Sequence, residues 1–214
     1  MARPGSSAPS PALRRVGVAP LRELFTLVRG PAAGAARWRG LLICAIVGTS
    51  MFVPNSATNS AAFGRQTGRP DAESGYPMLR LVAVVACGTR TVIDAVFGAY
   101  QVGETTWAPT LLQCLKPGML LLGDRNFAVT ALVEQIASAR AHLLIRCKDH
   151  RHLPPIKHLP DHSWLARMGA VTVRVIDARI QVHLAGGTTR TGHYRLVTTV
   201  TDEKRYPAAE LVEL

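Results

Sequence analysis

The chain has 214 residues and 48% of them are hydrophobic, which predicts a globular protein with one sizeable core and excludes a wholly disordered chain. No apolar run reaches the roughly 20 residues that a membrane-spanning helix needs. The amino-terminal stretch MARPGSSAPSPALRR lacks the apolar segment of a secretory signal. We therefore expect a cytoplasmic protein without a membrane partner.

The positive charge is uneven along the chain. The formal net charge is +11. Residues 1–70 contain nine arginines against one acid, whereas residues 71–214 contain 16 basic and 13 acidic residues. A basic first third favours a polyanionic partner such as DNA or RNA. A merely soluble, arginine-rich chain explains the charge equally well at this point.

The first 53 residues change from a polar to an apolar texture. Residues 1–12 are rich in Ser, Pro and Ala and are predicted to be disordered. The apolar spacing in residues 21–30 predicts a helix that ends at Gly30-Pro31. Residues 32–40 are predicted to be short helical or irregular. Residues 41–53, LLICAIVGTSMFV, lack helical spacing and are predicted to form a strand.

The next elements alternate between strands and helices. Residues 78–89 and 91–100 are two apolar runs with a very short joint, which indicates an antiparallel hairpin. A loop and helix follow in residues 103–115. The run GMLLLGD, residues 118–124, then predicts a strand that ends on a carboxylate.

A helix over residues 128–141 and a strand over residues 142–147 complete this part of the pattern. Strands interleaved with helices predict an α/β domain with one mixed sheet. Active sites in such sheets lie at the carboxyl ends of parallel strands. Asp124 occupies such an end, so it is the first candidate functional residue.

After Cys147 a basic loop rich in proline and histidine leads into alternating apolar and polar residues. The segments 170–177, 178–187 and 193–201 are each predicted to be strands with one solvent-facing side. We interpret residues 149–193 as a β-rich insertion or an added β layer.

Histidines and cysteines raise the question of a metal site. Five of the seven histidines lie between His142 and His162, near Cys147 and Asp149. Their spacings match no common zinc motif, and a surface loop is the favoured interpretation. Such a loop could instead contact phosphates through Arg146, Lys148, Arg151 and Lys157. The four cysteines contain no C-x-x-C and are predicted to be free thiols.

Six blocks of the sequence carry a resemblance to a known family. They are PLRELFTLVRGPAAGAARWRGLLICAI, NSAAFGR, SGYPMLRLVAVVACGTRTVIDAVFG, GETTWAPTLLQCLKPGMLLLGDRNF, LLIRCKDHRHLP and YRLVTTVTDEKRYPAAEL. In this order they resemble the blocks of actinobacterial insertion-sequence DDE transposases, a bacterial family whose third acid lies in a Y-R-E-type helix. The resemblance covers nearly the whole chain after about residue 13.

The resemblance implies an α/β fold with an RNase H-like mixed sheet flanked by helices, a β-rich insertion and a short helical amino-terminal segment. It also implies a division of the chain into regions. These are a basic, partly disordered or helical segment (1–40), the first part of the catalytic core (41–148), the β-rich insertion (149–193) and a return to the core (194–214).

The chemistry of this family is DNA transposition by metal-dependent phosphodiester cleavage and strand transfer. Two Mg²⁺ ions about 4 Å apart activate the nucleophile and stabilise the leaving oxygen. Mg²⁺ prefers hard oxygen ligands, which carboxylates supply. By resemblance, one Asp lies on the first strand, a second lies at the end of the fourth strand, and a Glu comes from a later helix. Asp124 matches the second position and is the expected catalytic and metal-binding residue.

The other two ligand positions depart from the family. Where the first strand typically reads AIDGT, this chain reads AIVGT, so Val47 occupies the position of the first Asp. The third acid is expected on a helix after the PAAEL block, and Glu210 and Glu213 do not match it. We therefore expect a degenerate, carboxyl-terminally truncated transposase with impaired Mg²⁺ binding. If Asp124 does not bind a metal, the alternative is a structural role in which it pairs with Arg125 or Arg146.

DNA at the element ends is the expected partner, with a full-length transposase or a second copy as possible protein partners and the nucleoid as the expected location. The expected DNA-binding residues are Arg14, Arg15, Arg37, Arg39, Arg65, Arg125, Arg146, Lys148 and Arg151. Two alternatives remain: a non-catalytic DNA-binding or inhibitory fragment, and a pseudogene product without function. An unrelated α/β enzyme is disfavoured because the phosphate-loop, dinucleotide-binding and G-x-S-x-G motifs are lacking.

Overall fold

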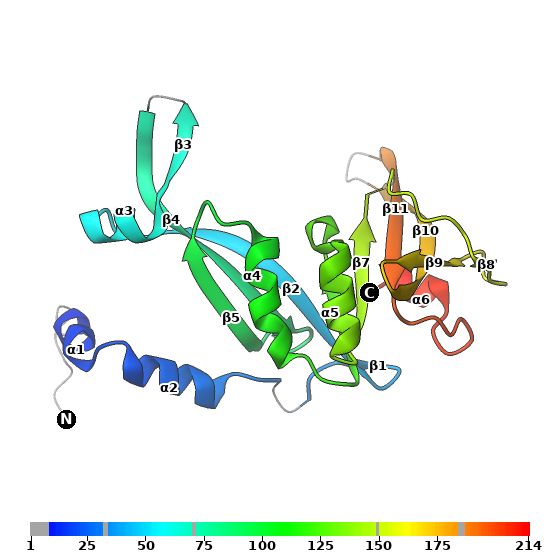
Figure 1. Ribbon diagram of the computed structural model, residues 1–214, viewed down its shortest axis with the longest axis horizontal. Helices are drawn as coiled ribbons and strands as arrows, with labels where there is room; N and C mark the ends of the chain where they lie inside the picture. The colour runs from blue at the N-terminus through cyan, green and yellow to red at the C-terminus, as the bar shows by residue number, and fades with distance from the viewer. Residues whose placement is uncertain (1–8, 32–33, 70–71, 149, 184–186) are drawn as a thin grey trace.

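The protein is described by a computed structural model covering residues 9–31, 34–69, 72–148, 150–183 and 187–214 (Figure 1). The helices are α1 (Pro9–Val16), α2 (Ala19–Val28), α3 (Ala57–Phe63), α4 (Glu104–Leu111), α5 (Thr130–Ser138) and α6 (Ala208–Val212), with 3₁₀ turns η1 (Leu112–Cys114) and η2 (Arg125–Phe127). The strands are β1 (Arg37–Trp38), β2 (Leu41–Phe52), β3 (Arg65–Arg69), β4 (Ala72–Ala86), β5 (Val92–Ala99), β6 (Met119–Gly123), β7 (His142–Cys147), β8 (Lys157–His158), β9 (Trp164–Met168), β10 (Val171–His183) and β11 (Thr189–Thr198).

One mixed sheet runs through the described chain, in the order β3-β4-β2-β6-β7-β11-β10-β9-β8. In addition, β5 pairs with β4, and β1 pairs with β2. Strands β2, β6 and β7 are parallel, whereas β4 and β5 are antiparallel to their neighbours. Helix α5 supplies the crossover that the parallel pair β6 and β7 requires. The predicted fold class, α/β with an RNase H-like mixed sheet flanked by helices, is confirmed.

The two faces of this sheet are covered to different extents. Helices α4 and α5 cover one face (Figure 1), where Cys44, Leu121 and Ile136 are fully buried. The short helix α6 covers the other face through Leu211, which packs on Ile43 and Leu120. We call the two surfaces the α4/α5 face and the α6 face. Alternate residues of each strand face opposite sides, so odd-numbered residues of β2 point toward the α6 face.

The α6 face is open over β2, β4 and β5. Facing residues on paired strands share a side of the sheet, and Thr49, Leu81 and Phe97 form one such row. In this region Val47, Met51 and Phe97 are 46%, 50% and 60% exposed. The sheet therefore presents apolar surface beside α6 as well as beneath it.

The structure confirms several predicted elements and corrects others. Helix α2 and the β4–β5 hairpin lie where the sequence placed them. The predicted strands 170–177 and 178–187 are instead continuous in β10 up to His183, because Asp177 and Ala178 pair with Arg195 and Tyr194 of β11 without a break; residues 184–186 lie outside the described residues. Helix α1 includes residues 9–12, which were predicted to be disordered. The disorder predicted for residues 1–8 lies outside the described residues.

The β-rich segment extends the same sheet. Strand β11 pairs with both β7 and β10, and it crosses the predicted boundary at residue 193. The region boundaries themselves stay predictions. All four cysteines are thiols, and Cys44 and Cys147 are buried. Within the described residues, none of the helices is both long and apolar enough to cross a membrane.

Candidate functional site at the carboxyl edge of the parallel strands

Asp124 stands at the solvent-exposed carboxyl end of the buried strand β6. Met119, Leu120 and Leu121 are buried, and Phe127 anchors the η2 turn that follows with 1% of its surface exposed. The Asp124 carboxylate caps that turn, because its Oδ1 accepts the backbone N–H of Asn126 at 2.8 Å. Within the described part of the chain it forms no ion pair, so neither Arg125 nor Arg146 is its structural partner. The carboxylate therefore remains available to a ligand.

Val47 lies beside Asp124 on the neighbouring strand. The parallel register of β2 and β6 pairs Ala45 with Leu122, and two further residues along each strand lead to Val47 and Asp124. Both residues line one cavity of about 360 Å³, which Arg146 also lines. Residues Leu211, Val212 and Leu214, in and just after α6, form another wall of the same cavity. The structure thus brings the two predicted ligand positions together.

The residues at this edge do not fit a two-metal site. Valine has no ligand atom, which leaves Asp124 as a single carboxylate. Among the described residues, no three His, Cys, Asp or Glu side chains gather closely enough to hold a metal ion. This finding includes the described histidines of the Pro/His-rich loop, whereas Asp149 lies outside the described residues. A two-metal centre needs several oxygen ligands from the protein.

A half-buried ion pair contacts β2 at Gly48 from the other side of the sheet. A Cβ atom on Gly48 would lie 2.3 Å from Cδ of Glu104, so only glycine lets this carboxylate approach β2. Glu104 accepts a hydrogen bond from Arg80 at 3.2 Å, and 17% of its side chain is exposed. The contact lies on the residue that follows Val47 in β2. The sequence pattern does not predict this contact, and the glycine after Val47 is the one signal of it.

A basic groove adjoins the Asp124 cavity. Two cavities of about 300 and 410 Å³ share most of their lining residues, and Arg146 belongs both to the larger one and to the Asp124 cavity. We define the basic groove by its polar lining residues, Arg125, Asn126, Arg146, Lys148, His150 and Arg151. Four of the predicted DNA-binding residues are therefore gathered next to Asp124. Asn126 and His150 were not predicted for this role.

The cations of the basic groove differ in how firmly the protein holds them. Arg125 and Lys148 are exposed, and neither forms an ion pair within the described residues. Arg146 lies over the ring of Tyr194 at 4.1 Å from the centroid. Arg151 donates to the Ala128 carbonyl at 2.5 Å and to the Thr130 hydroxyl at 2.7 Å. Arg125 and Lys148 are thus the cations most open to an anionic ligand, while Arg151 shapes the wall.

The remaining predicted DNA-binding arginines lie elsewhere. Arg37 donates to the Gly40 carbonyl at 3.1 Å near the start of β2, and Arg14 and Arg15 are exposed in the last turn of α1. Arg65 donates to the Asn55 amide oxygen at 2.6 Å, the Ser60 hydroxyl at 3.0 Å and the Gly75 carbonyl at 2.5 Å. These contacts hold the base of the β3–β4 hairpin, which projects at one end of the sheet (Figure 1).

Arg39 has a structural partner in α6. It forms an ion pair with Glu210, whose Oε2 accepts from Arg39 Nε at 2.8 Å and from Trp38 Nε1 at 3.1 Å. The hydrogen bond from Arg39 holds the pKa of Glu210 below its usual range, and the same bond raises the pKa of Arg39. This arginine therefore links β1 to α6 and lies apart from the basic groove.

Comparison with known proteins identifies the family. A family model described as "Transposase DDE domain" matches residues 33–214. The chain therefore belongs to the DDE transposases, which confirms the resemblance drawn from the six sequence blocks.

Two curated relatives and one solved structure give the extent of the similarity. The chain is 30% identical to InsZ of Escherichia coli K12 over 126 residues, 56% of this chain and 42% of InsZ. It is 26% identical to the transposase InsG for insertion sequence element IS4 of the same organism, over 97% of this chain and 49% of InsG. The piggyBac transposase synaptic complex with hairpin DNA matches 92% of this chain and 41% of its own, with 12% identity and a TM-score of 0.45. The chain spans about half the length of the curated relatives it matches.

Proposed function

We propose that this chain is a DNA-binding member of the DDE transposase family that binds the ends of its element but does not cleave them. One observation carries the proposal: the basic groove opens beside a candidate site that retains Asp124 and has Val47 in place of its partner carboxylate. Binding to the nucleoid follows from the same surface. The four-region division of the chain belongs to this proposal.

The basic groove suits a phosphate backbone. Arg125 and Lys148 are exposed cations, and Arg146 lies where the groove meets the Asp124 cavity. Lysine and arginine that neutralise phosphates release condensed counterions, so affinity for DNA falls steeply as salt increases. Phosphate contacts of this kind would hold a duplex at the carboxyl edge and set its position there.

The absence of cleavage follows from the ligand set. The family requires divalent metal, and Mg²⁺ is the ion its carboxylates suit. With Val47 beside Asp124, the first strand offers no carboxylate to a metal ion. A single exposed carboxylate holds Mg²⁺ only weakly, because this ion keeps several waters and needs near-octahedral oxygen ligands.

The binding proposal is tested by the salt dependence of affinity. Arg125→Gln and Lys148→Gln should each lower the slope of log affinity against log salt by roughly one unit for duplex DNA. Arg65→Gln is the matched control, since this arginine is already occupied by Asn55, Ser60 and Gly75. Fluorescence anisotropy at several salt concentrations measures all the slopes. An affinity that is independent of salt in the parent chain would contradict the proposal.

The cleavage proposal needs a separate assay. Supercoiled plasmid carrying the element ends, incubated with Mg²⁺ or Mn²⁺, should stay intact with the parent chain. Metal-dependent nicking by the parent that disappears in Asp124→Ala would show that the retained carboxylate supports catalysis, and would overturn this half of the proposal.

The open part of the α6 face favours association with another protein chain. Val47, Met51 and Phe97 are exposed on one continuous side of β2, β4 and β5, and contiguous apolar surface of this kind marks interaction sites. A second copy or a full-length transposase is the proposed partner. Light scattering of the parent and of Phe97→Glu tests the first: a dimer that the substitution dissociates supports self-association, whereas a parent that stays monomeric contradicts it.

A further inference from the structure

Arg174 is a charged residue of the sheet that is fully buried. It lies on β10 between Val173 and Val175, and all three have 0% of their surface exposed. A guanidinium stays protonated in proteins, so it cannot avoid the penalty of burial by losing its charge. Its position therefore depends on partners that replace water.

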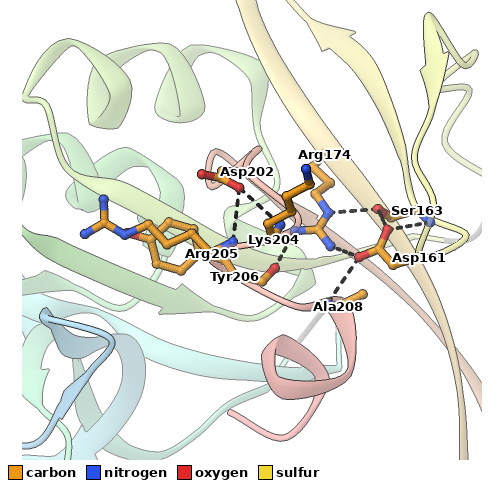
Figure 2. Close-up of polar contacts among 8 residues, drawn as sticks. All are labelled: Asp161, Ser163, Arg174, Asp202, Lys204, Arg205, Tyr206 and Ala208. Atoms are coloured by element: carbon orange, nitrogen blue, oxygen red, sulfur yellow. Dashed lines mark hydrogen bonds and ion pairs between the residues drawn. The ribbon is translucent and has the colours of Figure 1, made fainter.

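Those partners come from two separate segments of the chain, the turn before β9 and the residues just before α6 (Figure 2). Arg174 Nε donates to the Ser163 hydroxyl at 2.8 Å, Nη1 donates to the Tyr206 carbonyl at 2.6 Å, and Nη2 forms an ion pair with Asp161. Asp161 in turn accepts from the Ser163 hydroxyl at 2.5 Å and from the backbone N–H of Ala208 at 3.3 Å. Arg174 and Asp161 thus bind the backbone on both sides of Pro207.

We propose that Arg174 and Asp161 form a clamp through which the β-rich segment holds α6 against the sheet beside Asp124. Helix α6 has five residues and begins at Ala208, so the clamp grips its first turn. An isolated helix of this length is unstable in water, because nucleation is unfavourable and few hydrogen bonds follow. Its placement must therefore come from tertiary contacts.

The clamp reaches the candidate site through α6. Leu211, Val212 and Leu214 line the cavity that contains Val47 and Asp124, so release of α6 removes one wall of that cavity. Arg174 and Asp161 act as positioning residues, since neither lines the cavity. Their relevance to DNA rests on the proposed function, whereas the clamp itself does not.

A second anchor joins the first turn of α6 to β1. Glu210 binds Trp38 and Arg39, and the ring of Tyr206 lies 5.4 Å from that of Trp38. The side chains of Arg39 and Glu210 are each 38% exposed, whereas that of Arg174 is 0% exposed. Exposed ion pairs contribute little to stability, so the buried clamp should dominate the position of α6.

Site-resolved thiol labelling tests this inference without DNA or metal. Ala45 is half-buried on β2 and lines the cavity under α6, so a thiol introduced by Ala45→Cys reports release of α6. Cys44 is fully buried on the α4/α5 face and reports opening of the whole sheet. Adding Arg174→Met should speed labelling at position 45 by about tenfold or more beyond any acceleration at Cys44, because local release of α6 adds to the loss of global stability that both positions report.

Two further variants keep the test decisive. Asp161→Asn keeps the size of the side chain and should speed labelling at position 45 relative to Cys44 in the same direction if Arg174→Met does not fold. Arg167→Met is the matched control, since Arg167 is an exposed neighbour on β9 that donates only to the Ala170 carbonyl, at 2.8 Å, among the described residues; it should change neither rate. Equal acceleration at positions 44 and 45, or no acceleration at position 45, would overturn the clamp. Because no DNA is present, a failure of the proposed function leaves this result intact.

Discussion

Asp161 and Asp124 are two carboxylates in opposite situations. Asp161 is shared among Arg174, Ser163 and Ala208, and 26% of its side chain is exposed. Asp124 is exposed and accepts one hydrogen bond, from the Asn126 backbone. A carboxylate whose lone pairs are occupied by the protein holds the structure together, whereas one with free lone pairs at the carboxyl edge of a sheet is available for a ligand.

The same contrast applies to the basic residues. Arg174, Arg39 and Arg65 are engaged by acids, amides or carbonyls of the protein. Arg125 and Lys148 are exposed beside Asp124 and have no ion pair within the described residues. The partners of each charge, more than its presence in the sequence, separate structural residues from candidate binding residues.

The largest expected effect comes from making the same substitution at both carboxylates. Asp161→Asn should lower the free energy of unfolding by about 2–3 kcal/mol, because it leaves Arg174 with an uncompensated charge. This loss is somewhat smaller than the loss expected when a fully buried partner is removed. Asp124→Asn should change it by less than about 0.5 kcal/mol, since asparagine caps a turn as well as aspartate does. Urea unfolding at neutral pH measures both. Equal losses would remove the distinction between the two sites.

Low pH should reduce the effect of Asp161→Asn on the free energy of unfolding. Burial alone raises the pKa of Asp161, but the hydrogen bonds from Ser163, the charge of Arg174 and the Ala208 N–H outweigh it, so its pKa lies below the usual range. A carboxyl whose pKa is lower in the folded state stabilises the fold above its unfolded pKa, near 4, and loses this contribution as pH falls through the folded value. The stability gap between the parent and Asp161→Asn should therefore shrink below about pH 4. Unfolding curves across this range give the gap directly, and a constant gap would argue against the charged pair.

The smallest expected effect concerns the second anchor of α6. Glu210→Gln should destabilise the protein less than Asp161→Asn does, because the Glu210–Arg39 pair is exposed and screened by solvent. The effect of Glu210→Gln should also weaken at high salt, whereas that of Asp161→Asn should persist. Urea midpoints at low and high salt test the ranking. If Glu210→Gln lowered the stability more than Asp161→Asn, the contact with β1 and not the clamp would be the main anchor of α6.

Sequence pattern was sufficient to place Asp124. The apolar run of β6 and the chain order of strands and helices predict a parallel strand that ends on this carboxylate. The hairpin of β4 and β5 was predictable for a similar reason, since two apolar runs with a short joint leave few other pairings. Val47 was located through the resemblance, and the strand register places it level with Asp124.

Long-range packing explains what the sequence did not reveal. Alternation along β10 predicts that Arg174 faces solvent, but the chain returns across that side with Tyr206 and Ala208 and buries it. Alternation describes one strand and contains no information about a segment some 30 residues away. For the same reason, the sequence could not distinguish Arg65 and Arg39, whose side chains bind other residues of the protein, from Arg125, which is exposed.

The central claim, that Asp124 is an available ligand whose neighbour on β2 is Val47, can be tested by restoring the carboxylate. Two close carboxylates repel one another, so Val47→Asp should be somewhat less stable than the parent at low ionic strength. Bound metal should reverse the loss, and a concentration ten times Kd adds about 1.4 kcal/mol. The double variant Val47→Asp with Asp124→Asn is the matched control.

The decisive measurement is therefore the melting temperature against Mn²⁺ concentration for the parent, Val47→Asp and the double variant. The account predicts a rise of roughly 3–6 °C for Val47→Asp at such a concentration, with little response from the other two chains. A Val47→Asp chain that responds no more than the parent would contradict it, because Val47 and Asp124 would then not share a site.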